Sequence, residues 1–137
     1  HCDSLESVKW SKSTDIIPSN AFYQCSNLKN ITGIDAVNVI DTFAFAYSGL
    51  TSINLPPQII TISRFAFSQC EKLKLVKFNS YPSIHADAFW CSQNIKIDCG
   101  KIEKVKEWAL NADIPIFESE LNSFLNSVCT KERGDEK

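Results

Sequence analysis

Apolar residues recur along this chain at an interval of about 22 residues. The dipeptide Ala-Phe begins at residues 21, 44, 66 and 88, and an isoleucine stands four residues before each alanine. A small residue follows each phenylalanine within three positions: Cys25, Ser48, Cys70 and Cys91. Self-similarity at a fixed interval of this length predicts a solenoid in which each repeat forms one turn.

Each repeat also contains a short segment in which apolar and polar residues alternate. Segments 28–33, 50–55 and 73–78 share the spacing L-x-x-I-x-L, with conservative departures and one glycine, Gly33. Alternation with a period of two predicts a β-strand whose apolar side chains point to a core. Residues 2–10 reproduce the same spacing, so we expect the chain to begin within a repeat.

The L-x-x-I-x-L strand followed by Ala-Phe-x-x-Cys resembles the BspA-type leucine-rich repeat family over about residues 1–117. Residues 50–70 match its idealised repeat nearly throughout, including Pro56, Ile59 and Ile62. The resemblance implies an α/β repeat fold, a leucine-rich-repeat solenoid of about five turns with a short parallel sheet. It also implies adhesion or protein binding, because such repeats occur chiefly in bacterial surface proteins and in large protein sets of protists.

The pattern divides the chain into repeats at 1–100, a cap at 101–117 and a last segment at 118–137. Residues 101–112 carry apolar residues on one helical face, and 114–117 read as extended. A cap is required because an open solenoid end would expose the core. Residues 119–130 predict an amphipathic helix, with a charged tail after it; its apolar stripe is Leu121, Phe124, Leu125 and Val128.

Charge and composition exclude several classes of partner. The 137 residues include 14 Lys and Arg against 16 Asp and Glu, so a basic face for nucleic acid is not expected. The longest uncharged stretch, 42–63, contains Pro56 and Pro57 and several polar residues, so no membrane insertion is expected. The chain begins with His1 and lacks methionine, which indicates a processed product or a fragment. The compartment stays open: the resemblance favours a cell-surface or secreted protein over an intracellular one.

Reactive side chains do not form a recognisable site. Cys2, Cys25 and Cys70 share one column of the repeat with Ser48, and we predict reduced, buried thiols there, because stacked side chains point the same way. With no C-x-x-C motif, no metal site is expected. His85, the only internal histidine, reads as an exposed turn residue. No catalytic site, cofactor or small-molecule substrate is therefore predicted, and the chain is not expected to be an enzyme.

The outward strand positions remain as the candidate for function. Stacked strands would align them in one strip: Ser7, Lys9, Asn30, Thr32, Ser52, Asn54, Leu75 and Lys77. An apolar side chain at an outward position, Leu75, favours a contact with a protein partner over an ordinary solvated face. The sequence therefore predicts a non-catalytic protein-binding module that uses this face.

A second hypothesis concerns the helix predicted for 119–130. Its apolar stripe would either cover the chain's own solenoid or dock onto a larger intracellular complex, of which the chain would be a structural component. The two hypotheses predict different redox states for the cysteines, since a cytosolic assembly component is expected to keep its cysteines reduced.

Overall fold

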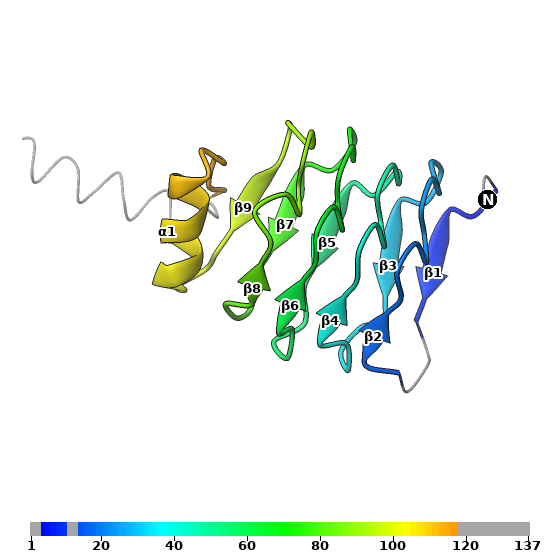
Figure 1. The fold of residues 1–137 in the computed structure, drawn as a ribbon, viewed down its shortest axis with the longest axis horizontal. Helices are drawn as coiled ribbons and strands as arrows, with labels where there is room; N and C mark the ends of the chain where they lie inside the picture. Colours follow the sequence, from blue (N-terminus) through cyan, green and yellow to red (C-terminus); the bar gives the residue numbers. More distant parts are fainter. Residues whose placement is uncertain (1–3, 11–13, 118–137) are drawn as a thin grey trace, which may run out of the picture.

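In the computed structural model, the described residues, 4–10 and 14–117, form a solenoid of parallel strands (Figure 1). The leucine-rich-repeat fold expected from the sequence is confirmed. Cys2 and the helix and tail predicted for 118–137 lie outside the described residues.

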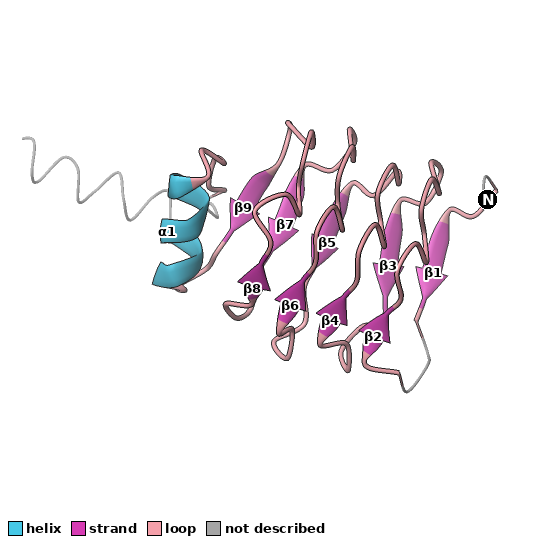
Figure 2. Cartoon of the chain, in the orientation of Figure 1, coloured by secondary structure: helices cyan, strands magenta, loops and turns pink. Residues whose placement is uncertain are grey.

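One side of the solenoid carries the strands predicted from the L-x-x-I-x-L segments (Figure 2). Each has a central apolar residue that points inward between two outward neighbours, as a period of two requires. They pair in parallel, β1 with β3, and β7 between β5 and β9. The strands are β1 (Ser7–Lys9), β3 (Asn30–Thr32), β5 (Ser52–Asn54), β7 (Leu75–Lys77) and β9 (Lys96–Asp98).

The isoleucine column forms a second parallel sheet on the other side of the core. Its members pair with one another in register, Ile17 with Ile40, Ile40 with Ile62 and Ile62 with Ile84. Each strand is only two residues long, which explains why the alternation pattern did not predict it. The strands are β2 (Ile16–Ile17), β4 (Val39–Ile40), β6 (Thr61–Ile62) and β8 (Ser83–Ile84).

The first sheet is interrupted between β3 and β5. Leu55 and Phe78 follow their strands and donate their backbone N–H groups to the next turn, at 2.9 Å each. Gly33 holds the equivalent position after β3 with φ +77° and makes no such bond to any described residue. A Cβ at Gly33 would lie 2.5 Å from the Trp10 carbonyl oxygen, so only glycine fits there.

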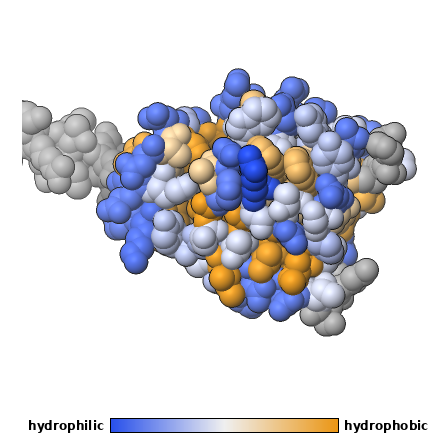
Figure 3. Space-filling view, in the orientation of Figure 1, coloured by the Kyte–Doolittle hydropathy of each residue, from blue (hydrophilic) through white to orange (hydrophobic). Residues whose placement is uncertain are grey.

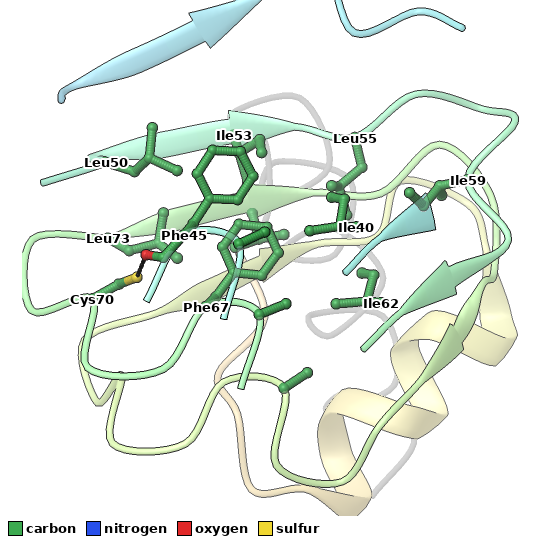
Figure 4. Packing of buried hydrophobic residues seen from close by; sticks show 14 of the residues in the cluster. Ile40, Phe45, Leu50, Ile53, Leu55, Ile59, Ile62, Phe67, Cys70 and Leu73 are labelled. Atoms are coloured by element: carbon green, nitrogen blue, oxygen red, sulfur yellow. Dashed lines mark hydrogen bonds between the residues drawn. The ribbon is translucent and has the colours of Figure 1, made fainter. Parts of the chain in front are cut away.

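The phenylalanines of the Ala-Phe elements stack through the centre of the solenoid (Figure 4). Ring centroids lie 5.3 Å apart for Phe22 and Phe45, 5.3 Å for Phe45 and Phe67, and 5.2 Å for Phe67 and Phe89. These distances are close to the spacing of parallel strands, so each interior ring packs on both of its faces. The cores of neighbouring turns therefore depend on one another.

The cap closes the C-terminal end of this core. Helix α1 (Glu103–Asn111) buries Val105 and Ala109 against the last turn. The Trp108 ring packs on Phe78 and Phe89, with centroids 5.7 and 5.9 Å apart. Behind the helix, residues 115–117 extend β9 through a parallel bridge between Ile97 and Ile116. The sheet edge and the apolar end of the core are both covered in this way.

Candidate functional site

The structure brings the predicted outward residues together in two groups. On the first strand pair, Ser7 lies beside Asn30, and Lys9 beside Thr32. On the next pair, Ser52 lies beside Leu75, and Asn54 beside Lys77. All of them are exposed except Leu75, which is half-buried. The interruption after β3 separates the two groups, although β3 still lies next to β5.

Two further residues extend this surface beyond those predicted. Lys96 pairs with Leu75, and Asp98 pairs with Lys77, because β9 continues the sheet. The alternation Ile95-x-Ile97-x-Cys99 was the signal that could have identified them. The polar strip, as we define it from here, comprises Ser7, Lys9, Asn30, Thr32, Ser52, Asn54, Leu75, Lys77, Lys96 and Asp98.

Part of the polar strip is held in place by hydrogen bonds. The Asn79 side-chain amide donates to Asn54 Oδ1 at 2.8 Å and to the Leu55 carbonyl oxygen at 2.6 Å. Asn54 is thereby oriented next to Lys77. Because the backbone beneath it is fixed by the sheet, this end of the polar strip is a pre-organised surface.

A row of aromatic side chains on the Ala-Phe turns was not predicted. Phe43 and Phe65 stack with centroids 5.1 Å apart, and the Arg64 guanidinium lies 4.7 Å from the Phe65 centroid. Tyr47 and Trp90 are 44% and 51% exposed. Phe43 and Phe65 share one position of the repeat and Tyr23 and Trp90 share another, whereas Tyr47 occupies a third, so the row forms no single column in the sequence. The row consists of Tyr23, Phe43, Tyr47, Phe65 and Trp90.

The second sheet also presents apolar side chains to solvent. Ile16 is 42% exposed and Ile60 is 59% exposed. Figure 3 shows hydrophobic surface over β4 and β6. This patch covers fewer strands than the polar strip, because the outward positions of β6 and β8 are polar, Thr61 and Ser83.

The prediction of reduced thiols in the shared column is half right. Cys70 is buried and free, but Cys25, also buried, is disulfide-bonded. The other cysteines of the described residues, at 70, 91 and 99, are free. Residues stacked in a parallel ladder are about 4.8 Å apart, which lies within the Cα–Cα range of disulfides, so stacking in one column does not by itself exclude a disulfide.

Other reactive groups do not assemble into a site. The His85 side chain is exposed, and its Nδ1 accepts a hydrogen bond from the Asp87 N–H at 3.0 Å. Within residues 4–10 and 14–117, no group of three or more His, Cys, Asp or Glu side chains could hold a metal ion. No helix in the same residues is long and apolar enough to span a bilayer.

Comparison with known proteins agrees with the fold. A family model described as "BspA type Leucine rich repeat region" matches residues 1–116 with six copies of the repeat. No curated protein matches the chain significantly, and no solved structure does.

Proposed function

The chain belongs to the BspA-type leucine-rich repeat family, and from this premise we propose that it binds a protein partner through the polar strip. Repeats of this family suggest a protein-binding module that is generally not catalytic. The observation that supports the proposal is the register of the strands: within each of the two groups, the outward residues of successive turns lie side by side.

Within this class we propose adhesion or surface recognition as the role. The disulfide at Cys25 supports this role, since disulfides persist in secreted and cell-surface proteins and are rare in reducing compartments. The same observation counts against the alternative of an intracellular assembly component that docks through Leu121, Phe124, Leu125 and Val128.

The focal contact is expected at the C-terminal end of the polar strip. Leu75 supplies an apolar side chain there, and Lys77, Lys96 and Asp98 surround it with charges of both signs. An apolar centre within a polar rim is the usual arrangement of residues at protein interfaces.

A charge-reversal experiment tests the proposal. The double variant Leu75→Glu with Lys77→Glu changes the centre of the polar strip and leaves the inward residues untouched. For a partner recovered by pull-down, calorimetry should show binding weakened at least about tenfold, which is 1.4 kcal/mol. The matched control, Ser83→Glu with Lys101→Glu, makes the same change of charge at exposed positions away from the polar strip. It should bind like the unchanged chain.

The opposite result would assign the interface elsewhere. If the Leu75 and Lys77 variant binds normally, while Phe124→Ser with Leu125→Ser abolishes binding in a chain that still folds, the polar strip is not the interface. The assembly hypothesis would then replace the one proposed here.

A further inference from the structure

Backbone hydrogen bonds join each Ala-Phe turn to the next in a regular ladder. In the first turn, the N–H of Phe22 donates to the Ala44 carbonyl at 2.7 Å, and the N–H of Gln24 donates to the Ala46 carbonyl at 2.9 Å. The same two positions donate in the following turns, at 2.8 to 3.0 Å: Phe45 to Ala66, Tyr47 to Ser68, Phe67 to Ala88 and Gln69 to Trp90. A third position, two residues before the phenylalanine, also donates to the next turn, at 3.1 to 3.4 Å: Asn20 to Thr42, Phe43 to Arg64 and Phe65 to Asp87. Each turn thus offers three N–H donors at alternate positions to its C-terminal neighbour.

Among the described residues, the last turn has no such neighbour. Of its three donor positions, Asp87 donates within its own turn, to His85 Nδ1 at 3.0 Å, whereas the backbone N–H groups of Phe89 and Cys91 bond to no residue in the described part of the chain. Both residues line an open groove of about 620 Å³ beside α1. The rest of its lining is largely apolar and includes Trp90, Trp108 and Ile114. We term it the terminal groove.

An occupant of the terminal groove must bring its own hydrogen-bond acceptors. An apolar group that covered the N–H groups of Phe89 and Cys91 without accepting from them would leave two buried donors unpaired, at the cost of their lost hydration. The carbonyl groups in the body of a helix cannot meet this need, because they accept hydrogen bonds within the helix, and only those of its last turn are free. The helix predicted for 119–130 could therefore pair with these donors only through its C-terminal end.

The cap excludes a second solenoid from the same end. Helix α1 covers the core, and residues 115–117 occupy the edge of β9, where the Ile97 N–H donates to Pro115 and the Phe117 N–H donates to Ile97, both at 2.8 Å. Among the described residues, nothing covers the edge of the last Ala-Phe turn beside them. A single peptide segment can reach this edge, whereas the whole face of another solenoid would meet the helix.

We propose that the terminal groove binds a peptide segment of a partner protein, which adopts the conformation of an Ala-Phe turn and takes the place of a further one. Two of its carbonyl groups, two residues apart, accept from Phe89 and Cys91. An apolar side chain of the segment packs between Trp90 and Trp108. The division of roles is the one known from addition of a strand to a sheet edge, in which the backbone gives affinity and pockets give specificity. The site is separate from the polar strip.

Amide hydrogen exchange of the full chain, followed by NMR, tests this assignment. The probe is a synthetic, end-blocked peptide with the sequence of residues 63–70 and serine in place of the last cysteine, since this segment is itself an Ala-Phe turn. Near saturation, the Phe89 and Cys91 amides should exchange at least about tenfold more slowly. A peptide of the same composition in scrambled order should give no protection.

Two variants connect the effect to the groove, and two controls separate it from other surfaces. Trp90→Ala removes an exposed wall, and Ala112→Trp fills the groove without removing a buried contact; each should weaken peptide binding at least about fivefold. Tyr47→Ala removes an aromatic ring of similar exposure in an interior turn and should leave binding unchanged. Leu75→Glu with Lys77→Glu should also bind the peptide normally, so failure here is distinct from failure at the polar strip.

Several results would overturn the proposal. One is the absence of protection at Phe89 and Cys91 with the peptide in excess. Another is protection in the free chain that disappears when residues 118–137 are removed, since the chain's own segment would then be the occupant. Protection that rises with protein concentration alone would assign the groove to a second copy.

Discussion

The Cys70 thiol lies 3.7 Å from the Ser48 hydroxyl, although 22 residues separate them in the sequence. The Cys70 Sγ also donates to the Phe45 carbonyl at 3.1 Å, as Figure 4 shows, and its backbone N–H donates to Ser92 Oγ at 2.8 Å. In the last repeat Ser92, and not Cys91, lies at the position equivalent to Ser48 and Cys70, so small side chains in this column link three successive turns. Burial of the Cys70 side chain raises its pKa above the value of 9.0 for an unperturbed thiol, against the opposing effect of the Ser48 hydrogen bond.

The raised pKa of Cys70 predicts a loss of stability at alkaline pH. Above pH 9.0 the unfolded chain releases the thiol proton while the folded chain retains it, so the free energy of unfolding should fall as the pH rises. Well below pH 9.0 the thiol is protonated in both the folded and the unfolded chain, so this loss of stability is absent. Urea unfolding between pH 7 and 10.5 should show a steeper fall for the unchanged chain than for Cys70→Ser, in which the column keeps a small polar side chain. Parallel slopes for the two chains would contradict the prediction.

The disulfide at Cys25 predicts sensitivity to reducing agents. A native disulfide typically contributes about 2 to 4 kcal/mol to the free energy of unfolding. Dithiothreitol should therefore lower the stability of the unchanged chain by about this amount and leave Cys25→Ser, already destabilised, unaffected. Serine is the matched replacement, since Ser48 occupies the same column. Equal urea midpoints with and without reductant would show that the bond does not stabilise the fold.

The columns of the solenoid could be predicted because each residue meets its equivalent in the next turn. Ile40 and Ile62, like Phe45 and Phe67, contact one another at a spacing set by the backbone, so the repeat in the sequence maps directly onto packing. The helix of the cap could be predicted from a different period, because Val105 and Ala109 recur at helical spacing. These features depend on local periodicity alone.

Other features depend on contacts between positions that are not equivalent. The aromatic row joins Tyr23 to Phe43 and Phe65 to Trp90 across different positions of the repeat, so no column marks it. The interruption at Gly33 follows from one close approach to Trp10. The open donors at Phe89 arise only where the ladder ends, which a repeat pattern treats as one more turn.

Phe67 should be the most costly ring to remove. It is fully buried between Phe45 and Phe89, with which it stacks at 5.3 and 5.2 Å. Phe67→Ala should lower the free energy of unfolding by about 3 to 5 kcal/mol, because it leaves a cavity shared by three turns. Tyr47→Ala, at an exposed ring of the neighbouring turn, should cost less than about 1 kcal/mol. Similar losses in urea unfolding would show that the aromatic column does not form the core.

Gly33 and Gly100 form a matched pair for testing close packing of the backbone. Both have left-handed φ angles, +77° and +54°, so an alanine at either position carries similar conformational strain. A Cβ at Gly33 would meet the Trp10 carbonyl oxygen at 2.5 Å, whereas nothing lies within 4 Å of a Cβ at Gly100. Gly33→Ala should therefore be less stable than Gly100→Ala by about 1 to 3 kcal/mol. Equal melting curves for the two variants would show that the backbones at Gly33 and Trp10 can move apart without loss of stability.

Trp108 should determine how well the cap protects the last turn. Its ring covers Phe78 and Phe89, but it is only half-buried, so Trp108→Ala should cost about 2 kcal/mol rather than the 3 to 5 of a fully buried ring. Leu110→Ala is the control in the same helix, because Leu110 is 57% exposed and its loss should change stability by less than about 0.5 kcal/mol.

Hydrogen exchange separates a capping role of Trp108 from a general loss of stability. Because each turn rests on its neighbours, opening should begin at the uncovered end and spread inward. In Trp108→Ala, amides of β9 should therefore exchange faster by a larger factor than amides of β4 and β6, which lie further from the cap. A uniform increase in exchange along the whole solenoid would mean that the chain unfolds as a single unit and that α1 does not act as a local cap.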